Sequence, residues 1–171
     1  MPRREELVRV VVGVDPPASE GGACGIVVCG LLGDGRGAVL ADCSIGGVRP
    51  EGWAARVAAA FTAWSADRVI AEANNGGAMV ESVLRTAAPG LPVKLVHASR
   101  GKSARAEPVA AAFETGRCLF AGCFPELEGE LTALTPAGFS GGRSPDRADA
   151  MVWALTELVV NRAAEPRVRG L

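Results

Sequence analysis

The first part of the chain is dominated by long apolar runs that are typical of buried β-strands. Residues 7–14, LVRVVVGV, are β-branched and almost wholly apolar, as expected of a central strand covered on both faces. Residues 23–32 and 38–45 have a similar character, and the sequence Gly-Asp-Gly at 33–35 between them is a hairpin-type turn signal. These three segments therefore predict an antiparallel meander.

After residue 50 the apolar residues take the spacing of helices that alternate with short strands. The predicted elements are a helix at 53–64, a strand at 68–71, a helix at 78–87, a strand at 92–96, a helix at 106–115, an edge strand at 118–121, a helix at 125–134 and a helix at 145–162. Ser144 is the expected N-cap of the last helix, with Pro145 as its first residue and a glycine-rich loop at 138–142 before it. This order predicts an α/β fold, in which an antiparallel meander is followed by parallel strands in one mixed sheet with helices on both faces.

The length and composition fit one domain with a core of small aliphatic side chains. The chain has 171 residues, of which 49% are hydrophobic and 22% charged, and a chain of this size can bury a substantial core. We expect an ordered core over about residues 6–162 and a mobile tail over residues 163–171. The five cysteines show neither a metal-binding spacing nor a disulfide pattern, so we expect them to be reduced and mostly buried.

The charge and the length of the apolar runs narrow the possible partners. A net charge of −1 provides no global positive field, so contact with a nucleic acid would need a local basic patch. The N-terminal apolar run is too short for a membrane span or a signal sequence. We therefore expect a cytoplasmic protein without a membrane partner.

Four acidic residues lie where carboxylates can gather. Asp15 closes the first apolar strand, and Glu72 closes the strand at 68–71. Asp146 and Asp149 are three residues apart and therefore share one face of the last helix near its start. Structural alternatives exist, namely an Asp-Pro turn for Asp15 and an interaction with the helix dipole for Asp146. Asp149 lies on a turn expected to pack against the sheet, so its carboxylate needs a partner, which Arg147 or a metal would supply.

Carboxylates gathered in one place favour a site for divalent cations. Their charges would repel one another and raise their pKa values unless cations neutralised them. Oxygen ligands favour Mg²⁺ or Mn²⁺ over zinc, and two such ions about 4 Å apart can drive phosphodiester cleavage without a histidine base. With one histidine and no tyrosine in the chain, the four acids are the predicted catalytic and metal-binding residues of a two-metal-ion nuclease.

Basic residues gather near residue 100, between a predicted strand and a predicted helix. Gly101-Lys102-Ser103 has the form of the end of a phosphate-binding loop, but the place of the leading glycine is taken by Val96, so we predict no nucleotide-binding site. Contacts with DNA phosphates, which are salt-sensitive and independent of base sequence, are the better role. The candidates are Lys94, Arg100, Lys102, Arg105 and, in the glycine-rich loop, Arg143. A solvated basic edge is the alternative, and for His97 a structural role stands beside a catalytic one.

Several of these segments together resemble one known family. They are GVDP at 13–16, RVIAEAN at 68–74, GKSARAEP at 101–108, SPDRADA at 144–150 and WAL at 153–155. In this order they are similar to the C-terminal nuclease domain of large terminases, the DNA-packaging proteins of tailed phages, prophages and gene transfer agents. The resemblance covers nearly the whole chain, and its last two motifs are fairly specific.

The resemblance implies a ribonuclease H-like fold and a metal-dependent, largely sequence-independent endonuclease that cuts concatemeric double-stranded DNA. By position, Asp15 and Glu72 match the family's first two metal-binding acids and Asp149 the third, while Asp146 occupies a neighbouring place that some members fill with another metal-coordinating or catalytic side chain. Two Mg²⁺ or Mn²⁺ ions are expected, one of them weakly bound. The resemblance also favours the DNA-contact role for Lys102 and Arg105.

Full-length terminases also carry a packaging ATPase, which has no counterpart in this chain, so we expect a single nuclease domain, monomeric in isolation. The expected partners are double-stranded DNA and, in the full system in the cytoplasm of a bacterial host, a packaging ATPase domain, a small terminase subunit and a portal. Two alternatives stay open. One is another ribonuclease H-like nuclease, such as a junction resolvase, a transposase-like enzyme or an RNA–DNA hybrid nuclease. The other is a non-catalytic DNA-binding or assembly module.

Overall fold

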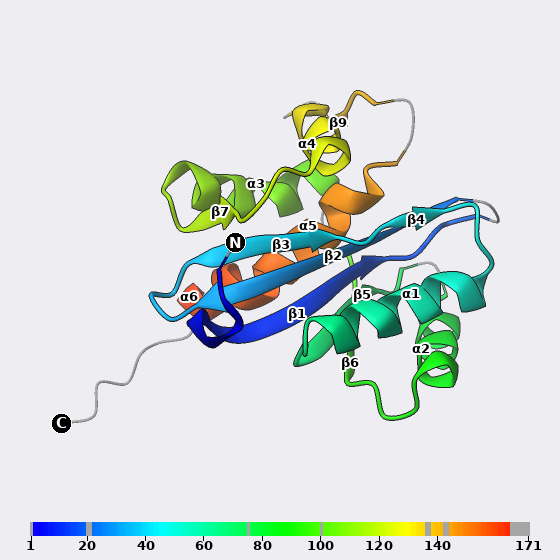
Figure 1. The fold of residues 1–171 in the computed structure, drawn as a ribbon. Coiled ribbons are helices and arrows are strands. Elements are labelled where there is room, and N and C mark those ends of the chain that lie inside the picture. The colour runs from blue at the N-terminus through cyan, green and yellow to red at the C-terminus, as the bar shows by residue number, and fades with distance from the viewer. Residues whose placement is uncertain are drawn as a thin grey trace.

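A seven-stranded mixed sheet forms the centre of the molecule, in the order β6-β5-β1-β2-β3-β7 with β4 paired to β2 (Figure 1). The computed structural model describes residues 2–19, 22–74, 76–99, 101–135, 138–141 and 144–164. The strands of the sheet are β1 (Leu7–Asp15), β2 (Ala23–Leu32), β3 (Gly37–Asp42), β4 (Ile45–Gly46), β5 (Arg68–Glu72), β6 (Val93–Val96) and β7 (Cys118–Phe120). Strands β1, β2 and β3 are antiparallel, whereas β5 and β6 continue from β1 in parallel and β7 pairs in parallel with β3. The predicted meander followed by parallel strands is confirmed, as is the edge strand at the end of the sheet.

Helices cover both faces of this sheet. They are α1 (Pro50–Ala63), α2 (Gly77–Ala87), α3 (Lys102–Glu114), α4 (Pro125–Thr132), α5 (Asp146–Leu155) and α6 (Asn161–Ala164). Figure 1 shows α1 and α2 on one face, and α5 on the other with α3 and α4 beyond it. Because side chains alternate along a strand, β1 faces both layers, with Val12 in the core that holds Trp53 of α1 and Val11 in the core that holds Met151 and Leu155 of α5.

Helix α5 crosses the sheet at close backbone distance. A Cβ atom at Gly13 of β1 would overlap the carbonyl oxygen of Ala150, and one at Gly25 of β2 would overlap that of Asp146. Any larger residue at these two positions would push the helix away from the sheet. The absence of two side chains therefore lets the first turns of α5 lie against the end of β1.

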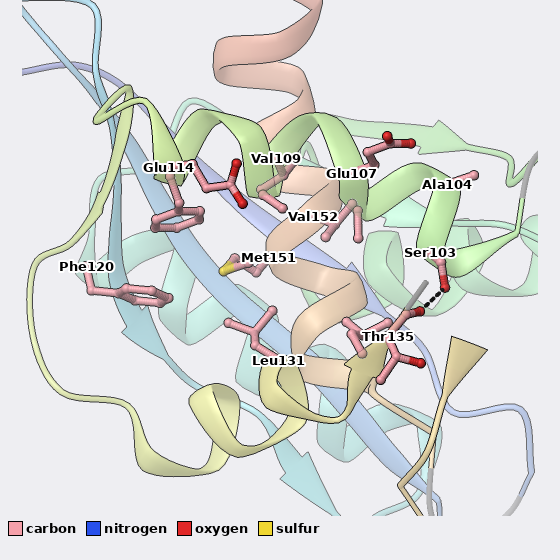
Figure 2. Close-up of a pocket in the computed structure, with 14 residues that line it drawn as sticks. Ser103, Ala104, Glu107, Val109, Glu114, Phe120, Leu131, Thr135, Met151 and Val152 are labelled. Carbon is pink, nitrogen blue, oxygen red and sulfur yellow. Dashed lines mark hydrogen bonds between the residues drawn. The ribbon is translucent and has the colours of Figure 1, made fainter. Parts of the chain in front are cut away.

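Helix α3 begins four residues earlier than the pattern predicts, at Lys102 rather than at about residue 106. Pro108 lies inside it, although a proline removes one helical hydrogen bond. Contacts from outside the helix hold this first turn, including a hydrogen bond of 3.0 Å from Ser103 Oγ to the carbonyl oxygen of Thr135 (Figure 2). Tertiary contacts thus outweigh the local signal that placed the start later.

The predicted strand at 38–45 is in fact two strands, because the chain bends after Asp42. The Asp42 carboxylate accepts a hydrogen bond of 3.0 Å from the backbone N–H of Ser44, which forms a local turn. The Ser44 hydroxyl in turn accepts one of 3.0 Å from the N–H of Ile26 on β2. These two bonds end β3 at Asp42 and start the short strand β4 at Ile45.

The start of the last helix also differs from the prediction. Pro145, rather than Ser144, is the N-cap residue, and it makes no side-chain capping bond. The Ser144 hydroxyl accepts a hydrogen bond of 3.1 Å from Lys102 Nζ. In the glycine-rich segment, β8 (Leu134–Thr135) and β9 (Gly138–Phe139) form a small antiparallel pair, so its first two residues are a strand rather than a loop, while Gly142 is outside the described residues.

The C-terminal helical run is divided into three parts. Helix α5 is followed by a π-helical turn, Thr156–Val160, and then by α6, which ends two residues beyond the predicted limit at 162. Residues 165–171, most of the predicted tail, lie outside the described residues. Among the described helices none is long and apolar enough to cross a membrane, and the five cysteines are free, three of them buried.

Candidate active site

Two acidic residues end neighbouring parallel strands. The register of β1 and β5 pairs Val14 with Ala71, so the next residues, Asp15 and Glu72, stand side by side where the strands end. Both side chains point to the face covered by α5. For Glu72 this follows from Ile70, which lies two residues earlier on the same face of β5 and belongs to the core beneath that helix. Local strand periodicity and one parallel pairing therefore bring together two residues that are distant in sequence.

The first turn of α5 adds two more carboxylates to the same place. Asp149 is 4% exposed and Asp15 is 8% exposed, and these are the two buried charged residues in the part of the chain that the structure describes. Asp146 is half-buried. Burial raises the pKa of Asp146 more than its hydrogen bond with Ser144 and the nearby Lys102 ammonium lower it.

The electrostatics of Asp15 show that the acids share one environment. Burial, followed by the carboxylates of Asp149 and Glu72, raises the pKa of Asp15 to about 8, and the Lys102 ammonium offsets only part of this rise. A carboxyl group with this pKa is mostly protonated at neutral pH. The site therefore holds more acidic groups than it can ionise at once without additional positive charge.

Two basic side chains of α3 supply part of that charge. Lys102 Nζ donates a hydrogen bond to Oδ2 of Asp149, and Arg105 donates one of 3.0 Å to Oδ1. Burial lowers the pKa of Lys102, but its hydrogen bond to Asp149 and the surrounding carboxylates together raise it above its ordinary value. The buried Asp149 does need a partner, as expected, but the proposal of Arg147 for that role is wrong.

Arg147 points the other way and joins three elements. Its guanidinium contacts Asp42 at the end of β3 at 3.0 Å, and Glu126 and Glu130 of α4 at 2.6 and 3.2 Å. The other oxygen of Glu130 accepts a hydrogen bond of 3.0 Å from the N–H of Ala148 in the first turn of α5. Arg147 therefore fixes α4 and the end of β3 against the start of α5 and carries no part of the acidic site itself.

Glu72 is held by a residue to which the sequence analysis gave no role. Trp153 Nε1 donates a hydrogen bond of 2.8 Å to Oε2 of Glu72, and the Arg105 guanidinium lies over the indole ring at 4.8 Å and reaches the same oxygen at 3.8 Å. Trp153 lies four residues after Asp149, on the same face of α5. That spacing was the signal that could have identified it.

The carboxylate oxygens of the four acids are suitable ligands for divalent cations, although in this structure the side chains are arranged around basic partners. Within the described residues, no group of three or more His, Cys, Asp or Glu side chains stands ready to hold one ion. The reason is visible in the contacts, since Lys102 and Arg105 occupy both oxygens of Asp149 and Trp153 holds one oxygen of Glu72. The excess of acid around Asp15 remains, and carboxylate oxygens are the ligands that Mg²⁺ and Mn²⁺ prefer.

The predicted DNA-contacting residues fall into three groups. Lys102 and Arg105 lie at the acids, whereas Arg100 and Arg143 lie outside the described residues. Lys94 is away from the acids and pairs with Glu157 at 2.7 Å. His97 is exposed one residue beyond β6.

A separate apolar cavity lies behind the first turn of α3. It has a volume of about 680 Å³ and lies between α3, α4 and α5, with Val109, Leu131 and Met151 among its lining residues (Figure 2). None of the four acids lines it. The four acids therefore lie outside this cavity, at the ends of β1 and β5 and at the start of α5.

Comparisons with known proteins point to one class. The family model described as "Terminase RNaseH-like domain" matches residues 12–158. The large terminase nuclease from thermophilic phage G20c has a TM-score of 0.69 at 18% identity, over 87% of this chain and 82% of that one. Structures of the same nuclease with bound zinc and with bound cobalt also match.

Two further structures place the fold in a wider group. The HK97 bacteriophage large terminase gives a TM-score of 0.66 at 15% identity, over 92% of this chain but 40% of that one. Thermus thermophilus RuvC gives 0.53 at 19% identity, over 91% and 96%. No curated protein matches the chain. At these identities the structural likeness concerns the fold, and the ribonuclease H-like fold implied by the resemblance is confirmed.

Proposed function

The chain belongs to the terminase RNaseH-like domain family, and from this premise we propose that it is a metal-dependent endonuclease that cuts concatemeric double-stranded DNA during phage-type genome packaging, largely independent of sequence. One observation carries the proposal. Asp15, Glu72 and Asp149 come from two strands and a helix to one buried place, where the neighbouring carboxylates help to raise the pKa of Asp15 to about 8. Burying several carboxyl groups together costs stability unless positive charge compensates them, and divalent cations supply such charge.

The residues that would hold divalent cations are Asp15, Glu72 and Asp149, with Asp146 beside them. Mg²⁺ or Mn²⁺ suits their oxygen ligands, and two ions are expected, one of them weaker. The zinc and cobalt complexes of the G20c nuclease support the use of a divalent metal. When bound, such ions supply activation of a water molecule and stabilisation of the leaving oxygen.

The basic side chains then have a second use. In the metal-free protein, Lys102 and Arg105 balance the charge of Asp149. With cations at the acids, Lys102, whose side chain is 39% exposed, would no longer be needed to balance Asp149 and would be available to contact a DNA phosphate. Arg105 stays against Trp153 and keeps Glu72 oriented.

The proposed function also implies a substrate and protein partners. Double-stranded DNA is the proposed substrate, and a packaging ATPase domain, a small terminase subunit and a portal are the proposed partners in the cytoplasm of a bacterial host. The match to 40% of the HK97 large terminase is consistent with a nuclease that works beside other domains. A tethered partner would raise the local DNA concentration at a weakly binding nuclease.

The direct test is cleavage of supercoiled plasmid with Mg²⁺ or Mn²⁺. We expect nicked and then linear DNA from the wild type, and a loss of at least about 100-fold in rate for Asp15→Asn, Glu72→Gln and Asp149→Asn, since each removes a ligand charge. Glu81→Gln is the control because Glu81 forms an exposed pair with Arg85 on α2. Cleavage by Asp149→Asn at the wild-type rate would contradict the assignment.

A junction resolvase is the second candidate, because RuvC and this chain cover one another almost completely and one matched RuvC structure contains a Holliday junction substrate. A substrate panel separates the two. Preferential cutting of plasmid over a four-way junction and an RNA–DNA hybrid supports the terminase role, whereas preference for the junction supports the resolvase. DNA binding with no turnover in either metal would indicate a non-catalytic module.

A further inference from the structure

A cluster of basic residues lies at the opposite end of the strands that carry the acids. The ammonium of Lys94 lies 2.7 Å from one carboxylate oxygen of Glu157, whose side chain is 10% exposed. The guanidinium groups of Arg9 and Arg68 each lie 3.8 Å from the other oxygen. We call these four residues the Glu157 cluster. Its cations come from β1, β5 and β6, which are neighbours in the sheet (Figure 1).

The Glu157 cluster is on the same sheet face as the acidic site but separate from it. Arg68 and Glu72 are four residues apart on β5 and therefore point to the same face, about 13 Å from one another along the strand. The pairing of β1 with β2 shifts register between Leu7 and Arg9, at this end of β1. The acids occupy the carboxyl ends of these strands and the cations their amino ends.

Charge in the Glu157 cluster is not balanced. Three positive side chains face one carboxylate, which leaves an excess of two positive charges in a chain whose net charge is −1. Among the described residues, neither Arg9 nor Arg68 pairs with another carboxylate, and 3.8 Å exceeds the length of a hydrogen bond. Each guanidinium has five N–H donors, so Glu157 leaves most of them available.

The local backbone and surface also fit a binding site. Glu157 lies on the π-helical turn Thr156–Val160, which contains neither proline nor glycine to explain it, and such turns occur frequently at functional sites. A cavity of about 350 Å³ opens beside Glu157, lined also by Arg9, Lys94, Asn161 and Arg162. Arg162 adds a further positive charge and Asn161 an amide donor.

We propose that the Glu157 cluster is an oxyanion site, separate from the acidic site, which binds a phosphate group through Arg9, Arg68 and Lys94. Guanidinium and ammonium groups are the side chains that recognise phosphate oxygens. Glu157 gathers the cations when no phosphate is bound and competes with the phosphate for them. The phosphate comes either from free phosphate compounds or from the DNA backbone, and the two sources are separable by experiment.

The test measures binding without divalent metal, so it does not depend on nuclease activity. Pyrophosphate is titrated by calorimetry into the wild type, Glu157→Gln and Arg68→Gln, with Arg85→Gln as the control from the exposed pair on α2. We expect Glu157→Gln to bind about fivefold more tightly and Arg68→Gln about fivefold more weakly than the wild type, as removal of one partly exposed charge implies. The control should match the wild type.

The opposite changes in affinity expected for Glu157→Gln and Arg68→Gln distinguish a binding site from a purely structural ion-pair network. If the network only fastens the π-helical turn to the sheet, both variants lose stability and neither gains affinity. No saturable binding by Glu157→Gln, or equal affinities in all four proteins, overturns the proposal. If Arg68→Gln unfolds, as judged by circular dichroism, Lys94→Met takes its place.

A second arm identifies the source of the phosphate. Binding of a labelled short DNA duplex to the same variants is followed by fluorescence anisotropy in metal-free buffer. The same order of affinities for the duplex supports the proposal with the DNA backbone as the source. If only pyrophosphate gives this order of affinities, the proposal is supported with a free phosphate compound as the source.

Discussion

Replacement of Asp15 by Asn should raise the free energy of unfolding of the metal-free protein. Asp15 is 8% exposed, and burial, with the neighbouring carboxylates of Asp149 and Glu72, raises its pKa to about 8. In the unfolded chain the pKa of an aspartate is about 3.9. Asn has nearly the same shape and no charge, so it escapes the penalty that the native state imposes on the ionised carboxylate.

The direction of the change in the free energy of unfolding follows from proton binding. Between pH about 4 and pH about 8 the native protein keeps a proton on Asp15 that the unfolded chain releases, so this group lowers the free energy of unfolding by about 1.4 kcal/mol per pH unit. The penalty is absent below pH about 4, reaches about 4 kcal/mol at pH 7 and levels off above pH about 8. These figures are upper limits because water and side chains relax around a buried charge.

The assay is urea unfolding followed by circular dichroism in EDTA at pH 5, 6, 7 and 8. The gain in stability of Asp15→Asn over the wild type should grow across this series. Asp42→Asn is the matched control, because Asp42 is a half-buried carboxylate paired with Arg147 at 3.0 Å, and its loss should destabilise the protein. A gain that is absent, or equal at pH 5 and pH 8, would refute the reasoning about Asp15.

Three further substitutions test the contacts around the site. Trp153→Phe removes the hydrogen bond to Glu72, and we expect a loss of about 1 kcal/mol in urea unfolding together with slower plasmid nicking; an unchanged nicking rate would show that Glu72 needs no such support. Gly13→Ala places a Cβ against the backbone of α5 and should lower the free energy of unfolding by about 2–3 kcal/mol, whereas Gly129→Ala, which meets no atom within 4 Å, should not. Lys102→Met should destabilise the metal-free protein by about 1–2 kcal/mol, seen as a lower melting temperature. Addition of Mn²⁺ should then raise the melting temperature more than in the wild type, because no ammonium competes for the Asp149 carboxylate; a smaller rise contradicts that competition.

The sequence analysis located the acids well because their placement depends on local patterns. An apolar run that ends in an acid predicts a carboxylate at a strand end, which is how Asp15 and Glu72 were identified, and a three-residue spacing places Asp146 and Asp149 on one helix face. The structure brings all four to one place. Their roles in metal binding and catalysis stay predictions that the cleavage experiment tests.

The errors concern contacts that bridge distant segments. The sequence analysis offered either Arg147 or a metal as the partner of Asp149. Residues two apart on a helix point in different directions, and Arg147 turns to α4 and β3. The sequence analysis placed the start of α3 at about residue 106, but the first turn begins at Lys102 and is held by Asp149 and Thr135 from other elements. No local pattern contains that information.

The sequence by itself determined the alternation of strand faces and the acids at the strand ends, because backbone geometry makes these properties local. The order of strands and helices along the chain predicted the antiparallel-then-parallel sheet. Only the tertiary structure decided that α5 lies against Gly13 and Gly25, that Lys102 neutralises an acid 47 residues away, and that three cations gather around Glu157. Such contacts arise from the packing of whole elements, in which each partner is positioned by a different part of the chain.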